Sequence, residues 1–296
     1  MKKVIIVAGP TASGKTKLSI ELAKHFNLEV INGDSVQALK QLNIGSAKIT
    51  EEEMQGVKHH LLDILEPTQK YSVFDFQRDA RQIIDESNDV KIICGGTGLY
   101  IKACVCNYEF VEGKREKSFE EKYEKYTNEE LYEILKQLDF EASQVLHFNN
   151  RRRILRAIEI VETSNDLKSN RNKKDEYLYN PLILFLNPKR EELYEYINKR
   201  VDEMVDLGLE KEVFDLYQQN IKVDAIGYKE FYPYFEQEIT LEEAIDNIKK
   251  NTRHFAKRQV TFFRNQLKLK MLDVDYNDFS KTIKNALELV EGYLNE

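Results

Sequence analysis

The feature that most constrains this chain is a glycine-rich segment near its N-terminus, placed between an apolar run and an amphipathic pattern. Its letters, GPTASGKT, fit the pattern G-x-x-x-x-G-K-[ST]. The glycines let successive backbone N–H groups converge on phosphate oxygens, and the start of the following helix adds its positive end. The segment therefore predicts a phosphate-binding loop (P-loop) made by Gly9, Pro10, Thr11, Ala12, Ser13, Gly14, Lys15 and Thr16.

Two side chains of this loop have an expected chemical role. Lys15 supplies a cation for the phosphates, and Thr16 supplies a hydroxyl for Mg²⁺. The motif does not identify the phosphate compound. Because most P-loop proteins bind a nucleoside triphosphate, nucleotide binding, with ATP foremost, stays open at this point.

Strand and helix signals alternate over the first hundred residues and return near the C-terminus. Apolar runs at 4–8, 30–31 and 91–94 are typical of buried parallel strands, and helical patterns lie between them. Capping boxes are expected where Ser72 is followed by Asp75 and where Thr240 is followed by Glu243. Alternation of this kind predicts an α/β fold, here a P-loop NTPase-like parallel sheet flanked by helices. We assign this core to residues 1–106 and 180–296. It gains further strands at 182–186 and 269–274, and helices at 188–207, 209–219 and 241–265 and from about 280.

The segment between the two parts of the core has a different pattern. Thr127 with Glu130 forms a capping box before an apolar helical face, and Asn149 or Asn150 is placed to cap the next helix. We find no strand signal there, so residues 107–179 are expected to form an inserted all-helical domain. Its polar tail, residues 164–176, is expected to be mobile.

Charge is distributed unevenly along the chain. The formal net charge is −7, which argues against a polyanionic partner, but residues 249–270 carry eight Lys or Arg and no acid. Local field matters more than net charge for docking on nucleic acid. A second basic stretch covers 151–174. A basic stripe lies on one face of the 241–265 helix, with aromatic side chains and a histidine interleaved: Lys250, Arg253, Lys257 and Arg264 with His254, Phe255, Phe262 and Phe263. It indicates either RNA binding or a solvent-exposed basic face whose phenylalanines belong to the core.

Polar side chains follow the second and third strands. Asp34 comes after the apolar pair at 30–31, and Thr97 lies in the glycine-rich turn after 91–94. Ligands of open parallel sheets collect at the carboxyl ends of strands, so both residues are expected in the crevice that faces the P-loop. Asp34 is then either a general base or a turn-capping residue, and Thr97 either faces the ligand or closes a tight turn.

Cysteine usage and apolar run lengths exclude other classes of protein. The three cysteines, Cys94, Cys104 and Cys106, are too few and too oddly spaced for a disulfide framework, and buried thiols are favoured over a zinc site. No apolar run approaches the roughly 18 residues that a membrane span requires. The N-terminal basic segment is too short for a signal peptide, so a cytoplasmic location without membrane partners is expected.

Blocks in order along nearly the whole chain resemble the bacterial tRNA isopentenyltransferase family. They are GPTASGKT at 9–16, Asp34-Ser35-x-Gln37, IGSAK at 44–48, HHLLD at 59–63, Tyr71-Ser72, GGTGLY at 95–100, Arg153-x-x-Arg156-Ala157-x-Glu159, GYKE at 227–230 and a last block that runs from Thr252-Arg253 through Lys257-Arg258-Gln259 to Thr261-x-x-Arg264. The chain departs from the family pattern at Val36 and Leu39.

The resemblance implies a substrate pair and roles for site residues. It implies that dimethylallyl diphosphate lies on the P-loop, with Mg²⁺, and that its prenyl group passes to N6 of the adenosine just 3′ of the anticodon in tRNA. It implies Asp34 as general base, Thr97 beside the reacting centre, and the insertion as the part that closes over tRNA. We expect a monomer in which the tRNA anticodon loop is contacted by Asp34, Ser35, Val36, Gln37, Arg152, Arg153, Ile154, Leu155, Arg156, Arg253 and Lys257.

Three alternative functions remain open at this stage. A relative that prenylates a free adenine nucleotide needs neither the basic stripe nor the insertion. An ATP-dependent small-molecule kinase is permitted by the P-loop alone. A non-catalytic RNA-binding module has no need of Asp34, Thr97 and Lys15 together.

Overall fold

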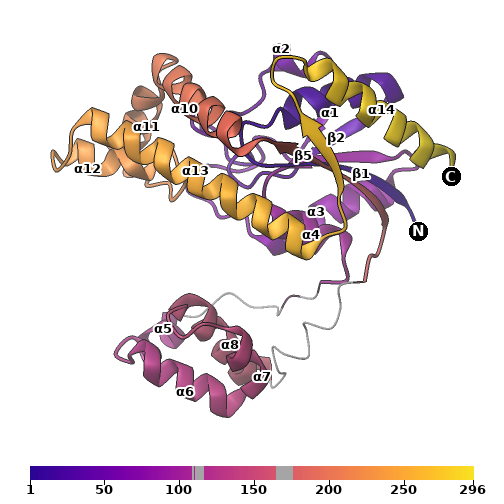
Figure 1. Ribbon diagram of the computed structural model, residues 1–296. Coiled ribbons are helices and arrows are strands. Elements are labelled where there is room, and N and C mark those ends of the chain that lie inside the picture. The colour runs from indigo at the N-terminus through magenta and orange to yellow at the C-terminus, as the bar shows by residue number, and fades with distance from the viewer. Residues whose placement is uncertain (109, 111–116, 165–175) are drawn as a thin grey trace. The chain divides into compact units, whose positions relative to one another are not determined.

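The computed structural model describes residues 1–108, 110, 117–164 and 176–296, and it divides into two compact units (Figure 1). The first unit comprises Met1–Val105 and Tyr177–Glu296, and the second comprises Cys106–Glu176. The boundaries expected from the sequence differ from these by one residue on the first side and by three on the second. Within the described residues, no helix combines the length and the apolar character needed to cross a bilayer.

A six-stranded, fully parallel sheet forms the centre of the first unit, as the sequence predicts. The strand order is β3-β2-β4-β1-β5-β6. The central strand is apolar and fully buried from Val4 to Ala8, which is why it needs helices on both faces. The strands are β1 (Lys3–Ala8), β2 (Glu29–Asn32), β3 (His59–His60), β4 (Lys91–Gly95), β5 (Asn180–Pro188) and β6 (Lys270–Val274).

Helices cover both faces of this sheet (Figure 1). On one face α1 (Lys15–Phe26) and α14 (Phe279–Asn295) share a core with alternate residues of the strands, such as Ile5 and Val7. On the other face α3 (Val73–Glu86) packs on α4 (Gly98–Val105). The Ser72–Asp75 capping box expected at the start of α3 is present.

A second core of the same unit lies among the helices that follow β5. Its largest fully buried side chains are Tyr228 and Phe231. The predicted capping box of Thr240 with Glu243 starts the longest of these helices. The helices are α10 (Arg190–Asp206), α11 (Leu209–Gln218), η1 (Lys229–Phe231), α12 (Tyr232–Phe235) and α13 (Leu241–Gln266), and the short α2 (Glu51–Met54) follows the loop after β2.

The described part of the second unit is all helical, as expected. Thr127 and Glu130 form the predicted capping box, and Oδ1 of Asn150 accepts a hydrogen bond from the Arg153 backbone N–H at the start of the last helix. The tail expected to be mobile falls mainly on 165–175, outside the described residues. The helices are α5 (Lys117–Tyr123), α6 (Asn128–Leu138), α7 (Phe140–Val145) and α8 (Arg151–Ser164).

Candidate active site

The P-loop lies between β1 and α1, where the sequence places it. Gly14 has a φ of 89°, and a Cβ there would come within 2.7 Å of the Phe279 ring, so only glycine fits. The Ser13 hydroxyl is buried and donates to the Pro10 carbonyl at 2.8 Å. The Lys15 ammonium donates to the same carbonyl at 2.7 Å. These contacts fix the loop around its own backbone and leave its outer side open to a ligand.

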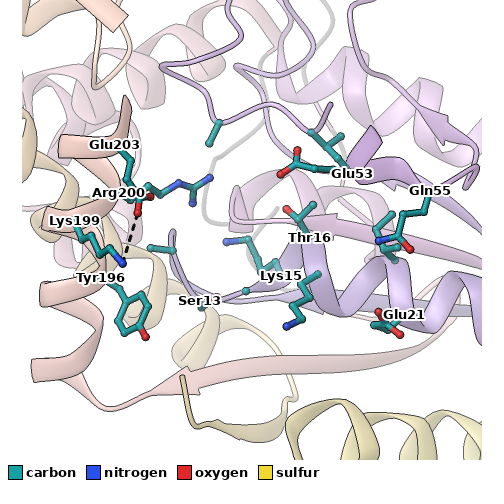
Figure 2. A pocket seen from close by; sticks show the side chains of 16 residues that line it. Ser13, Lys15, Thr16, Glu21, Glu53, Gln55, Tyr196, Lys199, Arg200 and Glu203 are labelled. Carbon is teal, nitrogen blue, oxygen red and sulfur yellow. Dashed lines mark ion pairs between the residues drawn. The ribbon is translucent and has the colours of Figure 1, made fainter. Parts of the chain in front are cut away.

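A cavity of about 580 Å³ opens beside this loop, and we call it the P-loop cavity. The side chains of Lys15, Thr16 and Arg200 line it, with Glu53 and Tyr196 on its wall (Figure 2). Burial, and to a lesser extent the Arg200 charge, lowers the pKa of Lys15 to about 8, although Cys94 and Asp34 act against this shift. A buried cation beside a second cation is costly, and a bound anion removes that cost.

A second cavity of about 300 Å³ adjoins the first, and we call it the Asp34 cavity. Both predicted catalytic residues, Asp34 and Thr97, line it together with Ser35 and Val36. Its remaining wall is largely apolar, with Ile197, Val201, Met204, Ile226, Ile248 and Phe255. Three residues line both cavities, Ala12, Ala47 and Arg200, so a ligand group in one lies next to a group in the other.

Asp34 reaches this position because two strand ends approach closely. The Gly33 N–H donates to the Cys94 carbonyl at 2.8 Å, and a Cβ at Gly95 would lie 2.3 Å from the Gly33 oxygen. Oδ1 of Asp34 accepts the Val36 backbone N–H at 2.9 Å, so the turn-capping role is real. Within the described part of the chain nothing bonds to Oδ2, which leaves that oxygen available to a ligand. The turn contact therefore uses one oxygen of the carboxylate and does not exclude the general-base role expected from the sequence.

Thr97 occupies the turn that starts α4. Its carbonyl accepts the backbone N–H of Tyr100 at 2.9 Å and of Ile101 at 3.3 Å, which holds the turn closed. Its side chain faces the Asp34 cavity. The structure thus brings Asp34 and Thr97 to one cavity, and the turn contacts of Thr97 do not prevent it from lining that cavity.

Arg200 is the residue that sequence reasoning missed. It is half-buried on α10, and burial lowers the pKa of its guanidinium despite the carboxylates of Glu53, Glu203 and Asp34 nearby. In the described residues no acceptor hydrogen-bonds to it. Its spacing after Leu193 and Ile197 places it on the apolar face of the helix, and a lone charge on such a face was the available signal.

The side chains of the predicted basic stripe on α13 differ in their exposure and in their contacts with the rest of the protein. Lys250, Lys257 and Arg264 are exposed, and the Arg264 guanidinium donates to Oδ1 of Asn187 at 2.9 Å. The Arg253 guanidinium is half-buried and donates to Oδ1 of Asn198. Of the interleaved phenylalanines, Phe263 is core, against Phe185, and Phe255 lines the Asp34 cavity with the Arg258 guanidinium 5.7 Å from its ring.

The predicted RNA-binding segment on α8 separates into exposed and buried positions. Arg152 and Arg153 are exposed, while Arg156 pairs with the buried Glu159 at 2.8 Å. Leu155 is half-buried. Ile154 is fully buried in the core of the second unit, so the side chain that the sequence analysis places in the RNA-contacting segment packs inside the protein. Its spacing before Ala157 and Ile158 puts it on the inner face of the helix.

The residues after Asp34 mainly organise the neighbouring loop. The Gln37 side-chain amide donates to the carbonyls of Ser46 and Ala47, each at 3.1 Å. Val36 and Leu39, where the chain departs from the family pattern, are both half-buried against the second core. Packing explains why apolar side chains are accepted at these two positions.

Comparison with protein-family models finds a match to the family described as IPP transferase, over residues 37–266. The chain belongs to this family. The P-loop and Asp34 lie before the matched span, but full-length relatives cover them. The tRNA dimethylallyltransferases of Anoxybacillus flavithermus and Bacillus licheniformis are each 44% identical, over 98% and 92% of this chain and 97% and 90% of their own lengths.

Solved structures of the family have the same fold. The tRNA isopentenylpyrophosphate transferase of Staphylococcus epidermidis is 38% identical, with a TM-score of 0.74 over 99% of this chain and 100% of its own. A eukaryotic dimethylallyltransferase described as acting on tRNA is 28% identical, with a TM-score of 0.87 over 100% of this chain and 80% of its own.

Proposed function

We propose that this chain transfers the dimethylallyl group of dimethylallyl diphosphate to N6 of the adenosine adjacent, on the 3′ side, to the tRNA anticodon, releasing diphosphate. The observation that carries the proposal is the direct adjacency of a cation-lined cavity and a carboxylate-lined cavity. A group transfer needs a leaving-group site next to an acceptor site with a base. The names of the full-length relatives support tRNA as the acceptor and a dimethylallyl group as the group transferred.

The leaving group is held by the P-loop cavity. The first residues of α1 and the side chains of Lys15 and Arg200 line it (Figure 2), so a helix N-terminus and two cations are available to the phosphates. Negative charge grows on the diphosphate as the C–O bond breaks, so cations fixed in advance stabilise the transition state more than the bound substrate. Arg200 also reaches the Asp34 cavity, which suits a residue placed near the bond that breaks.

The donor set of this cavity fits Mg²⁺. Thr16 presents an exposed hydroxyl, and Glu53 lies on the same wall (Figure 2). No group of three or more His, Cys, Asp or Glu in the described residues forms an all-protein cage. Mg²⁺ in phosphate sites takes most of its ligands from water and phosphate oxygens, so few protein ligands are needed. When bound, the ion would offset charge on the departing diphosphate.

The acceptor adenine enters the Asp34 cavity. Its apolar wall accommodates a flat base, and the base must leave its stack to reach the cavity. The N6 lone pair is delocalised into the ring, so the amine is a weak nucleophile. As the bond from N6 to the allylic carbon forms and the C–O bond breaks, Oδ2 of Asp34 takes one N6 proton, and the electron pair of the C–O bond leaves with diphosphate.

Incubation with bulk tRNA from cells that lack the modification, with Mg²⁺ and dimethylallyl diphosphate, tests this function. Nucleoside mass spectrometry should show one five-carbon unit on an adenosine, with diphosphate released in equal amount. Modification of free adenosine monophosphate instead of tRNA would favour the nucleotide-prenylating alternative. Turnover of ATP with no prenyl transfer would favour a kinase. The cytoplasmic location and monomeric state are part of the proposal, and light scattering of the protein tests the latter.

A further inference from the structure

Gln259 of α13 has no role in the chemistry described above, yet its side chain joins two loops of the site. It is 5% exposed. Its Oε1 accepts the Thr11 backbone N–H at 2.9 Å, and its Nε2 donates to the Gly96 carbonyl at 3.0 Å. Thr11 belongs to the P-loop, and Gly96 directly precedes Thr97.

The fit around this amide is tight. A Cβ on Gly96 would lie 2.2 Å from Nε2 of Gln259, so the glycine allows the amide to reach the carbonyl. Burying an amide costs free energy unless its groups are hydrogen-bonded, and both functional groups of this amide are engaged. The contact also commits the Thr11 N–H to α13 instead of the phosphates. A side chain that only filled space at this buried position would not need polar groups.

We propose that Gln259 is a positioning residue that sets the distance between the diphosphate loop and the Thr97 turn. The proposal rests on the prenyl-transfer function. The P-loop, which follows β1, lines the donor cavity, and the Thr97 turn, which follows β4, lines the acceptor cavity. Misplacement of reacting groups by about 1 Å can cost about 10²-fold in rate. Loss of the bridge therefore reduces kcat, while KM for each substrate, which each cavity determines alone, changes little.

The substitution Gln259→Glu turns the bridge into a titratable one. An ionised glutamate still accepts from the Thr11 N–H but repels the Gly96 carbonyl. A protonated glutamate donates to that carbonyl and reproduces the amide pattern, and burial raises the pKa of such a carboxyl. We expect kcat relative to the unmodified protein to be at least about tenfold lower at pH 8 and to recover as pH falls to about 6.

Gln266→Glu is the matched control. Gln266 is exposed on the same helix and accepts from the Lys102 ammonium at 2.7 Å, outside both cavities. The substitution introduces the same charge, and the ratio of its kcat to that of the unmodified protein should stay near one at each pH. Circular dichroism at each pH establishes that both variants are folded.

Amide hydrogen exchange on peptides that cover 9–16 and 95–100 provides a readout independent of activity. In Gln259→Glu both peptides should exchange faster at pH 8 than at pH 6, after correction for intrinsic rates, and in Gln266→Glu neither should. A folded Gln259→Glu variant with an unchanged kcat ratio and unchanged exchange overturns the proposal. Failure of the prenyl-transfer function is recognised separately, because the unmodified protein then makes no prenylated tRNA while the exchange result still decides the bridge.

Discussion

Affinity for dimethylallyl diphosphate should fall with rising pH because of Lys15. In the ligand-free protein, burial lowers the pKa of its ammonium from 10.5 to about 8. That shift corresponds to roughly 3 kcal/mol against the charged form, at 1.36 kcal/mol per pKa unit. A bound diphosphate restores the charge, so binding above pH 8 takes up a proton. Affinity then falls by up to about tenfold per pH unit, with uptake of about half a proton at pH 8 and about 0.9 at pH 9.

Isothermal titration calorimetry in buffers of different ionisation enthalpy, from pH 7 to 9.5, measures both quantities. Lys15→Arg keeps its charge throughout this range, so its affinity should be nearly independent of pH, whatever its absolute value. The same residue has the opposite effect on folding. Its native pKa is lower than its unfolded pKa, so the unfolded chain binds more protons between pH 8 and 10.5, and this contribution to stability rises with pH. A pH-independent affinity in the unmodified protein, or an equal slope in Lys15→Arg, would refute the reasoning.

Three further variants, one of them a double substitution, test other parts of the protein. Asp34→Asn keeps an acceptor for the turn but loses the basicity, so kcat should fall by about 10²–10⁴-fold in single-turnover assays while the melting temperature changes little. The Glu212 carboxylate accepts the backbone N–H groups of residues 43–45, and Glu212→Gln replaces it with a neutral amide. Urea titration should then show a free energy of unfolding that is lower by about 1–3 kcal/mol, and an unchanged midpoint would contradict this. Neutralising Arg152 and Arg153 should reduce tRNA affinity and flatten its log–log salt dependence, and an unchanged slope would place the contact elsewhere.

Much of the fold follows from local patterns. The buried strands, the P-loop and the capping boxes at Ser72, Thr127 and Thr240 depend on residues close in sequence, and all were predicted correctly. The two-residue strand β3 was missed because His59 and His60 have no apolar run or alternation to mark them. It forms only because β2 offers it an edge to pair with.

Long-range contacts in the site were beyond local patterns. Arg200 and Gln259 stand on helices more than 180 residues after the P-loop. Arg200 belongs to none of the family blocks, and the block that contains Gln259 does not indicate what that residue does. Their place in the site is visible only in the structure, where Arg200 lines both cavities and the Gln259 side chain hydrogen-bonds to the backbones of two loops. Ile154 shows the converse case. The family resemblance places it in a segment expected to contact RNA, but its position within the helical period directs that side chain into the core.

Two alanines with left-handed backbone conformations lie at the boundary between the two cavities. Ala12 and Ala47 line both cavities, and both have left-handed backbones, with φ of 61° and 47°. That conformation costs an L-residue roughly 1–2 kcal/mol, so something must hold each one in place. The Tyr276 hydroxyl donates to the Ala12 carbonyl at 3.0 Å, and the Gln37 amide donates to the Ala47 carbonyl. Strain of this kind persists only where surrounding contacts over-determine it, and it clusters at functional sites. The junction between the two cavities is therefore shaped by Tyr276 and Gln37 through two alanines, so the Gln37 side chain has a structural task beside the site that is independent of any contact with tRNA.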